Sequence, residues 1–321
     1  MKIVILDGYT TNPGDISWAP FEALGELVTY EYTAPDEIFG RLEGVSVCLT
    51  NKTCFPKEVL EKLPDLRYIG CLSTGFNVVD IEYCHDHGIT VTNIPEYATY
   101  ATAQMTIALL LEIANQVGHH SDLVHDGVWT RGRDFCFWDG TLTELWGKTL
   151  GLFGFGKIAS RVSKIADAMG MKVLACRRSE VTEEMKKADP QVTFVDEETL
   201  WRESDILSFH CPLTPATTGL VNAETISKMK DGVILINTSR GPVLDEAAVA
   251  SALSSGKIAA LGADVVSVEP IREDNPLLSA PNTFLTPHIA WAPKDTRERL
   301  MDVASGNLEC YLKCEPRNVV S

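Results

Sequence analysis

The stretch from Lys148 to Arg178, KTLGLFGFGKIASRVSKIADAMGMKVLACRR, decides the fold of this chain. The apolar run Leu150–Phe153 predicts a buried parallel strand, and Gly154 and Gly156 predict a sharp turn after it. The spacing of the following apolar residues predicts a helix that Gly170 ends, and the run Lys172–Cys176 predicts a second strand. The stretch therefore predicts a strand–turn–helix–strand unit of the doubly wound type.

The glycine turn has the properties of a phosphate-binding loop. Gly154 lets the chain turn tightly, and Gly156 leaves room for a diphosphate beside bare backbone. The helix that begins near Lys157 offers unpaired N–H groups and the positive end of its dipole, and Ala159 is small enough for close packing on the strand. A strand–helix turn without a ligand is the alternative. We expect a dinucleotide site formed by Gly154, Phe155, Gly156, Lys157 and Ile158.

About twenty residues after the turn, the chain has Arg177-Arg178-Ser179 where a site for NAD usually has an acid. A carboxylate would repel a 2′-phosphate, whereas a guanidinium binds it through charge-assisted hydrogen bonds. The alternative is a pair of solvated arginines at a strand end. The sequence favours NADPH as the cofactor, with NADH as the alternative.

Strand and helix patterns alternate along all 321 residues, which predicts an α/β fold with two domains. We expect a Rossmann-type doubly wound parallel sheet in residues 100–291. Residues 1–99 with 292–321 are expected to form a flavodoxin-like parallel α/β domain that binds substrate. In that domain the pattern predicts a helix over Phe21–Leu27 and a strand over Val28–Tyr30. The long apolar helix Ala101–Ile113 is expected to join the two domains.

Composition excludes several classes of partner. The net charge of −16 argues against nucleic acid and anionic membranes, and no apolar run approaches the length of a membrane span. The nine cysteines are scattered, and no His cluster completes a metal site. Met1 leads directly into the strand Lys2–Leu6 without a signal peptide, so we expect a cytoplasmic protein with reduced thiols.

Three ionisable residues each follow a late predicted strand: Arg240, Glu269 and His288. Because the carboxyl ends of parallel strands meet at one edge of a sheet, these side chains can converge there. Reduction of a 2-oxo acid needs a hydride, a cation for the substrate carboxylate and a proton donor for the forming alkoxide. Arg240 suits the carboxylate, His288 suits the proton transfer, and Glu269 can orient the imidazole. Taken singly, each residue has an ordinary structural alternative.

With these motifs in order, the chain resembles the D-2-hydroxyacid dehydrogenase family over nearly its whole length. It is most similar to the glycerate dehydrogenase (hydroxypyruvate reductase) branch. The resemblance is carried by seven motifs: Ser73–Asn77, Asn93–Pro95, Gly154–Gly156, Cys211–Thr214, Asn237–Gly241, Ala263–Val265 with Glu269–Pro270, and Pro287–Trp291. It implies reduction of a small 2-oxo acid, with hydroxypyruvate or glyoxylate favoured. D-Lactate-type and phosphoglycerate dehydrogenase specificity are the alternatives.

The resemblance also implies roles for individual residues. Arg240 would anchor the substrate, His288 would act as acid and base, and Glu269 would orient it. Backbone N–H groups around Ser73, Thr74 and Gly75 would bind the substrate carboxylate. Further cofactor contacts are implied at Cys211, Pro212, Thr217, Thr238, Ser239, Asp264 and Ala290, with Asp264 at the nicotinamide carboxamide. The chain departs from the family pattern at Ala159, at Ala290 and at the arginines after the second strand.

The segment Arg131–Trp146 is unusually aromatic for a connection, with Phe135, Phe137, Trp138 and Trp146. An exposed apolar loop usually marks an interface. In similar family members this region is an arm across a two-fold dimer. We therefore expect a homodimer in which Trp138 helps to shape the substrate pocket, and a loop folded onto its own domain is the alternative.

A binding protein of the corepressor type, which senses a dinucleotide on the same fold, is the alternative from another functional class. It would lack turnover and would carry an added peptide-docking surface. The complete set of Arg240, Glu269 and His288 favours an enzyme. A formate dehydrogenase would be expected to have glutamine where Glu269 stands.

Overall fold

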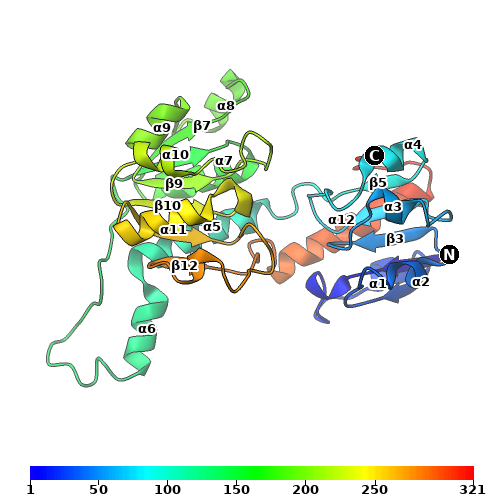
Figure 1. The fold of residues 1–321 in the computed structure, drawn as a ribbon, viewed down its shortest axis with the longest axis horizontal. Coiled ribbons are helices and arrows are strands. Elements are labelled where there is room, and N and C mark those ends of the chain that lie inside the picture. The colour runs from blue at the N-terminus through cyan, green and yellow to red at the C-terminus, as the bar shows by residue number, and fades with distance from the viewer. The chain divides into compact units, whose positions relative to one another are not determined.

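The chain folds around two separate parallel sheets in a computed structural model that describes all residues, 1–321. Unit 1 consists of residues 1–98 and 291–321, and unit 2 consists of residues 99–290. Both ends of the chain lie in unit 1 (Figure 1). Every strand pair in the two sheets is parallel, as predicted.

Unit 1 has a five-stranded sheet in the order β2-β1-β3-β4-β5, which is the flavodoxin-like order. Its strands are β1 Lys2–Ile5, β2 Glu26–Thr29, β3 Val47–Thr50, β4 Tyr68–Cys71 and β5 Thr90–Thr92. Its helices are α1 Ala19–Glu22, α2 Ile38–Leu42, α3 Lys57–Leu60, α4 Ile81–Asp86 and α12 Lys294–Leu312, with a 3-10 turn at Gly8–Thr10.

Successive residues of these strands alternate between two cores. Val4 of β1 packs with Ile38 and Leu42 of α2 on one face. Ile3 and Ile5 pack on the other face, in a core that includes Leu300 and Leu308 of α12. The C-terminal helix thus covers one side of the N-terminal sheet.

Unit 2 has a seven-stranded sheet in the order β12-β11-β10-β9-β6-β7-β8, which is the Rossmann-type order extended by one strand. Its strands are β6 Thr149–Phe153, β7 Lys172–Cys176, β8 Val192–Phe194, β9 Ile206–Phe209, β10 Val233–Asn237, β11 Ile258–Ala263 and β12 Thr283–Leu285. Its helices are α5 Thr99–Asn115, α6 Val117–His125, α7 Lys157–Ala168, α8 Glu183–Ala188, α9 Glu197–Glu203, α10 Ala223–Lys228 and α11 Glu246–Ser255, with 3-10 turns at Gly241–Val243 and Pro276–Leu278.

Two cores lie on the two faces of this sheet. The core under α5 and α7 includes Leu150, Leu152 and Ile206. The core under α9, α10 and α11 includes Leu207 and Phe209 and is built around the buried Trp201. Figure 1 shows these helices on either side of the strands.

The structure differs from the sequence predictions for helices in three respects. The helix predicted over Phe21–Leu27 ends at Glu22, because Glu26–Thr29 pairs with β1 and becomes β2. The helix predicted to join the domains, Ala101–Ile113, lies entirely within unit 2 as part of α5, where it packs on α7 and on strands β10 and β11. Helices α6 and α8 were not predicted, and neither has a buried residue whose spacing could have revealed it.

A buried carboxylate lies at the carboxyl end of β1. Asp7 is 7% exposed and accepts hydrogen bonds from the backbone N–H groups of Asn51, Lys52 and Thr53 at 2.6–2.8 Å. The hydroxyls of Thr50 and Thr53 add two longer ones. The strand order reverses between β1 and β3, where such sheets usually bind ligands. In unit 1 this crevice is occupied by the protein's own Asp7.

None of the helices combines the length and the apolar character that crossing a bilayer requires.

Candidate active site

The three residues predicted to share a site leave neighbouring strands of unit 2. Arg240 follows β10, Glu269 follows β11 and His288 follows β12, and these strands are adjacent in the sheet. Because all three strands are parallel, the three side chains start from the same edge. The sequence placed each residue after its strand, and the sheet order brings the strand ends together.

A buried asparagine shapes the turn that carries Arg240. The Asn237 side chain donates to the Arg240 carbonyl at 3.0 Å and accepts from the N–H and hydroxyl of Ser239. The next residue, Gly241, lies so close to the backbone of Val266 that a Cβ there would come within 1.9 Å of the Val266 carbonyl carbon. This packing sets the Arg240 turn directly against the segment that leads to Glu269.

His288 and Glu269 form a direct pair. The distance between His288 Nδ1 and Glu269 Oε2 is 2.7 Å, and the two side chains are 29% and 34% exposed. The contact leaves Nε2 as the ring nitrogen available to a substrate, which is the arrangement of an oriented acid–base imidazole.

The loop that carries His288 is held by Asp264, which is 1% exposed. Its carboxylate accepts from the Thr286 hydroxyl at 2.6 Å and from the N–H groups of Ile289 and Ala290 at 2.9 and 2.8 Å. The His288 N–H donates to the Asp264 carbonyl, and His288 has a left-handed backbone with φ of 55°. A histidine rarely adopts this conformation, so surrounding contacts must maintain it.

The glycine turn after β6 has the geometry of an anion cradle. Gly154 has φ of 86°, and a Cβ there would lie 2.9 Å from backbone atoms of His210 and Cys211. Beside Gly156, in contrast, a Cβ would meet nothing within 4 Å. Gly156 caps the twelve-residue helix α7, whose first turn contains no acidic residue, and the N–H groups of Gly156 and Ile158 have no partner in the protein. These features fit the diphosphate of a dinucleotide.

The arginines predicted at the ribose end of the dinucleotide lie just after β7. Arg177 donates through Nε to the Ser179 hydroxyl at 2.8 Å, and Arg178 donates to the Ala216 carbonyl at 2.7 Å. Arg178 and Ser179 are exposed, and Arg177 is partly buried. Two guanidinium groups and a hydroxyl thus gather beside the strand next to the glycine turn.

Several other residues predicted to bind the cofactor have side chains that already contact other parts of the protein. The Phe155 ring is buried and packs edge-on against Phe194 at 5.1 Å, so only its backbone can face a ligand. Thr217 donates to the Pro212 carbonyl, and the Thr238 hydroxyl pairs with that of Thr106 at 2.8 Å. Cys211 is buried, and burial raises the pKa of its thiol.

His210 was not singled out from the sequence, although it follows β9 as Arg240 follows β10. It lies against Gly154, and its Nε2 is 2.9 Å from the Ser208 hydroxyl. Burial lowers the pKa of His210 from an ordinary value near 6.5 to about 4. The imidazole beside the glycine turn is therefore neutral at physiological pH. Its position at a strand end was the signal that could have identified it.

In unit 1, the loop Ser73–Gly75 follows β4. Thr74 Oγ1 donates to the Ile94 carbonyl at 2.8 Å, Asn93 Nδ2 donates to the Thr74 carbonyl at 2.8 Å, and the Ile94 N–H donates to the Ser73 carbonyl. These bonds fix the loop, while the N–H groups of Thr74 and Gly75 have no partner in the protein. A fixed pair of unpaired N–H groups is suited to a carboxylate.

The predicted aromatic connection belongs to a projection that we call the arm, residues 117–146. It begins with α6, which has no buried residue, and Figure 1 shows α6 and the following loop extending away from the sheet of unit 2. Phe135, Trp138 and Trp146 are all largely exposed. Trp138 belongs to none of the hydrophobic cores of the chain.

The arrangement in unit 2 provides an oriented imidazole, a guanidinium on the adjacent turn and an anion cradle at the same sheet edge. Such a set can hold an anionic substrate and exchange a proton with it beside a dinucleotide. In the described chain, no group of three or more His, Cys, Asp or Glu side chains could hold a metal ion.

Comparison with known proteins assigns a family to this arrangement. A family model described as the NAD-binding domain of D-isomer specific 2-hydroxyacid dehydrogenases matches residues 107–290. A hydroxypyruvate reductase from Blautia hydrogenotrophica is 50% identical over the whole of both chains. A glycerate dehydrogenase from Methylorubrum extorquens is 37% identical, over 99% of this chain and 98% of that protein.

Solved structures with the same fold contain dinucleotides. An acyclic imino acid reductase in complex with NADPH and D-Arg aligns over the whole of both chains with a TM-score of 0.85 and 28% identity. A D-lactate dehydrogenase from Aquifex aeolicus complexed with NAD and lactic acid aligns with a TM-score of 0.82 and 29% identity, over 98% of this chain and 96% of that one.

The low pKa of His210 predicts a pH-dependent contribution to stability. Between pH 6.5 and 4 the unfolded chain binds a proton at this residue and the folded chain does not, so stability falls as the pH falls. The free energy of unfolding should have fallen by about 2 kcal/mol at pH 5. Urea unfolding at pH 7 and pH 5 should show a smaller loss for His210→Gln than for the wild type. Equal losses in the two proteins would contradict the assignment of a neutral imidazole with a lowered pKa.

Proposed function

Since the chain belongs to the D-isomer specific 2-hydroxyacid dehydrogenase family, we propose that it reduces hydroxypyruvate or glyoxylate with a nicotinamide dinucleotide. The observation that carries the proposal is the 2.7 Å contact between His288 and Glu269, next to the strand end that bears Arg240. Proteins named hydroxypyruvate reductase and glycerate dehydrogenase share the full length of the chain, which supports these substrates.

In the proposed reaction each residue has one task. When bound, the nicotinamide supplies the hydride that reaches the carbonyl carbon of the 2-oxo acid. Arg240 binds the substrate anion and polarises its carbonyl group. His288 donates the proton of Nε2 to the forming alkoxide, and Glu269 stabilises the imidazolium and keeps the ring in place. Glu269 acts through His288 and is a positioning residue.

The Asp264 carboxylate has a structural task in this proposal. It already accepts three hydrogen bonds from the loop that carries His288. A carboxylate has about four acceptor sites, so one remains for the carboxamide of the nicotinamide. We propose that Asp264 binds both the carboxamide of the nicotinamide and the loop that carries His288, and so positions the cofactor relative to the imidazole.

For unit 1, we propose that the N–H groups of Thr74 and Gly75 bind the substrate carboxylate. The hydrogen bonds to Ile94 and from Asn93 fix this loop before substrate arrives, so little ordering accompanies binding.

We further propose that NADPH is preferred over NADH. The anion cradle suits either dinucleotide, but Arg177, Arg178 and Ser179 supply donors for a 2′-phosphate and no carboxylate that would repel it. NADPH in one solved relative and NAD in another support the dinucleotide itself rather than the preference.

The proposed assembly is a homodimer in the cytoplasm. The arm exposes four large aromatic side chains and a helix with no buried residue, and an isolated domain rarely leaves so much apolar surface in water. We propose that the arm packs on a second copy and that Trp138 reaches the substrate site there. A reducing cytoplasm suits the nine cysteines.

Substitution of the proposed catalytic residues tests the reaction. His288→Asn should lower kcat/KM for hydroxypyruvate by about 10²–10⁴-fold, because the proton donor is lost. Arg240→Lys should also lower it strongly, because an ammonium cannot form the bidentate contact. The matched surface variants His85→Asn and Arg202→Lys should keep wild-type rates. Near-wild-type activity of His288→Asn or Arg240→Lys would refute the assigned role.

The cofactor proposal predicts a higher kcat/KM with NADPH than with NADH. Replacing Arg177 and Arg178 together with alanine should lower the NADPH-to-NADH ratio by about 10–100-fold, since each bond to a charged group contributes about 1.5–3 kcal/mol. Arg202→Ala serves as the control. A wild-type preference for NADH would rule out the proposed role of the two arginines.

If the protein is a homodimer, it should sediment with the mass of two chains at micromolar concentration. Deletion of the arm tip, residues 129–139, should shift the protein toward a single chain because the exposed aromatic contacts are lost. A wild-type protein that sediments as a monomer would contradict the proposal.

A further inference from the structure

Glu269 lies on a long loop of unit 2, residues 264–275, between β11 and the 3-10 turn at Pro276–Leu278. Residues 267–270 of this loop are exposed. A segment with so few buried apolar contacts is held in place only where polar contacts fix its backbone. The 2.7 Å contact between Glu269 and His288 therefore depends on the groups that bind this loop.

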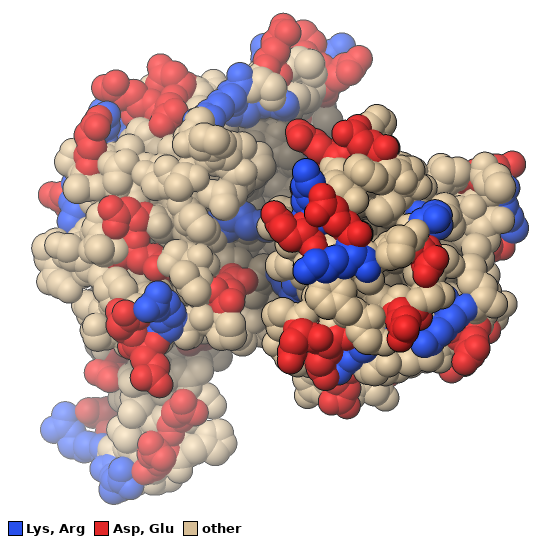
Figure 2. Space-filling view, turned by 45° about the vertical axis from the view of Figure 1, so that its right-hand side comes forward, with Lys and Arg blue, Asp and Glu red and all other residues tan.

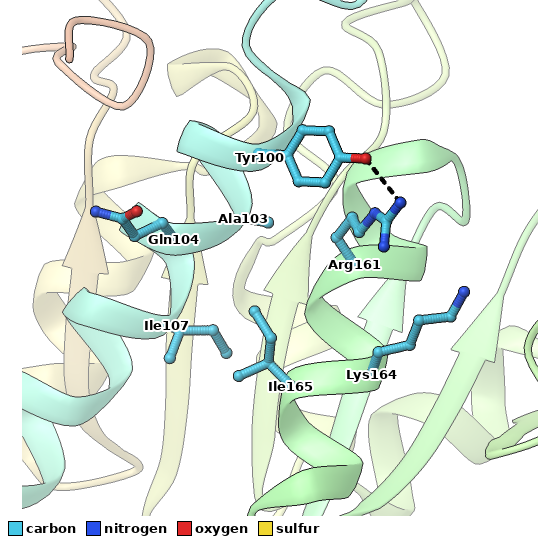
Figure 3. Close-up of a pocket in the computed structure, with 7 residues that line it drawn as sticks. All are labelled: Tyr100, Ala103, Gln104, Ile107, Arg161, Lys164 and Ile165. Carbon is cyan, nitrogen blue, oxygen red and sulfur yellow. Dashed lines mark hydrogen bonds between the residues drawn. The ribbon is translucent and has the colours of Figure 1, made fainter. Parts of the chain in front are cut away.

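The hollow of about 440 Å³ between α5 and α7 is not the source of these contacts. Its lining residues all belong to those two helices, and within it Arg161 donates to the Tyr100 hydroxyl at 2.8 Å (Figure 3). The polar contacts to the loop come instead from α11, which packs in the core on the other face of the sheet.

One side chain of α11, Glu246, binds both ends of the loop. Its Oε1 accepts from the Ser267 N–H at 2.7 Å, and its Oε2 accepts from the Ser267 hydroxyl at 2.6 Å and from Asn275 Nδ2 at 3.0 Å. Asn275 is 9% exposed, and its Oδ1 accepts from the Leu277 N–H, so its amide has one orientation. The carboxylate thus joins a residue before Glu269 to a residue after it.

Neither its own helix nor a cation occupies the Glu246 carboxylate. The N–H groups of Ala247 and Ala248, in the first turn of α11, both donate to the Asp245 side chain. Acidic side chains are spread over the surface in Figure 2, and several bind a neighbouring lysine. The partners of Glu246 are instead three neutral donors of one loop. Because bonds to a carboxylate are about twice as strong as bonds between neutral groups, this side chain can hold the loop.

The bonds of Glu246 are connected to the imidazole through two further contacts. Ser267 follows Val266, whose N–H lies 3.4 Å from Glu269 Oε1. The other oxygen of Glu269, Oε2, lies 2.7 Å from His288 Nδ1. A displacement of Ser267 would therefore move the backbone that holds one oxygen of Glu269, and the other oxygen would leave the ring.

We propose that Glu246 is a positioning residue of the acid–base pair and acts through Glu269 on the protonation of His288. While the loop is held, the Glu269 carboxylate stays beside the ring and favours its protonated form. When the loop is released, the carboxylate moves into water and this support is lost. The proposal rests on the reduction proposed above, in which the protonated ring is the proton donor, and adds a residue outside the substrate site to it.

The other charged groups near the ring do not depend on Glu246. Asp264 is bound to the loop that carries His288, and Arg240 at the adjacent strand end donates to the Ser239 carbonyl. Neither of them contacts Glu246, so a change at Glu246 reaches the ring through Glu269.

Glu246→Gln tests the proposal, because it keeps the shape of the side chain and replaces one acceptor by a donor. Whichever way the new amide lies, its NH₂ group faces an N–H of Ser267 or of Asn275. We expect kcat/KM for hydroxypyruvate reduction to fall about tenfold or more. The pH above which kcat/KM declines should move about one unit lower, since less of the ring is protonated.

Glu198→Gln is the matched control, because Glu198 is an exposed acid in the first turn of α9. It should leave both the rate and the pH limit unchanged. A Glu246→Gln enzyme with the rate and pH limit of the wild type would overturn the proposal.

A double variant shows whether Glu246 acts through Glu269. Glu269→Gln should also move the pH limit lower, and adding Glu246→Gln to it should cause no further shift, because the group that transmits the effect is gone. A purely structural role of Glu246 would leave the two shifts additive. Additive shifts would overturn the route through Glu269.

Exchange of donor and acceptor provides a rescue. When Asn275→Asp is combined with Glu246→Gln, the new carboxylate at position 275 accepts from the new amide at position 246, and its other oxygen still caps the Leu277 N–H. The combination should regain most of the wild-type rate and pH limit, whereas Asn275→Asp alone brings two carboxylates together and should lower both. A combination no better than Glu246→Gln would count against the proposal.

Should Glu246→Gln fail to fold, Ser267→Ala removes only the hydroxyl bond and should lower the pH limit by a smaller amount. An unchanged limit in that variant would then overturn the proposal.

The outcomes separate this proposal from the function on which it rests. A wild type that reduces neither hydroxypyruvate nor glyoxylate would overturn the proposed function and the role of Glu246 with it. An active wild type with an inactive His288→Asn variant and an unchanged Glu246→Gln variant would overturn only the role of Glu246.

Discussion

The geometry of the active site depends on the burial of one carboxylate, that of Asp264. Its two oxygens hold the Thr286 hydroxyl and the N–H groups of Ile289 and Ala290, so the loop between them has one conformation. In that conformation His288 has a left-handed backbone and its ring meets Glu269. Without these bonds the strain at His288 would have no compensation, and the imidazole would lose its orientation. The position of the proposed catalytic imidazole thus depends on one buried group.

The two sheets differ at the point where their strand order reverses. In unit 2 the strand order reverses between β6 and β9, and the glycine turn there leaves open space beside Gly156 and unpaired N–H groups at α7. In unit 1 the reversal between β1 and β3 is filled by Asp7, which takes the N–H groups that a ligand would need. In unit 1 the unpaired N–H groups are instead found in the loop Ser73–Gly75, at Thr74 and Gly75.

Much of this architecture could be predicted because buried parallel strands are continuous apolar runs with residues of interest at their ends. Arg240, Glu269 and His288 were proposed as site residues in this way, and the parallel α/β fold followed from the same runs. The helix over Phe21–Leu27 was wrong because strand pairing with β1 outweighs local preference. Helix α6 could not be predicted, since it has no buried face to produce a periodic pattern. The roles of Asp264 and Asp7 depend on contacts between loops that only the folded chain brings together.

A crystal structure with NADP⁺ and oxamate, a 2-oxo acid analogue that resists reduction, tests the central claim most directly. The account predicts that oxamate lies within hydrogen-bond distance of both His288 Nε2 and the Arg240 guanidinium, with His288 still bound to Glu269. Oxamate bound away from His288 and Arg240, beside a correctly placed dinucleotide, would contradict it.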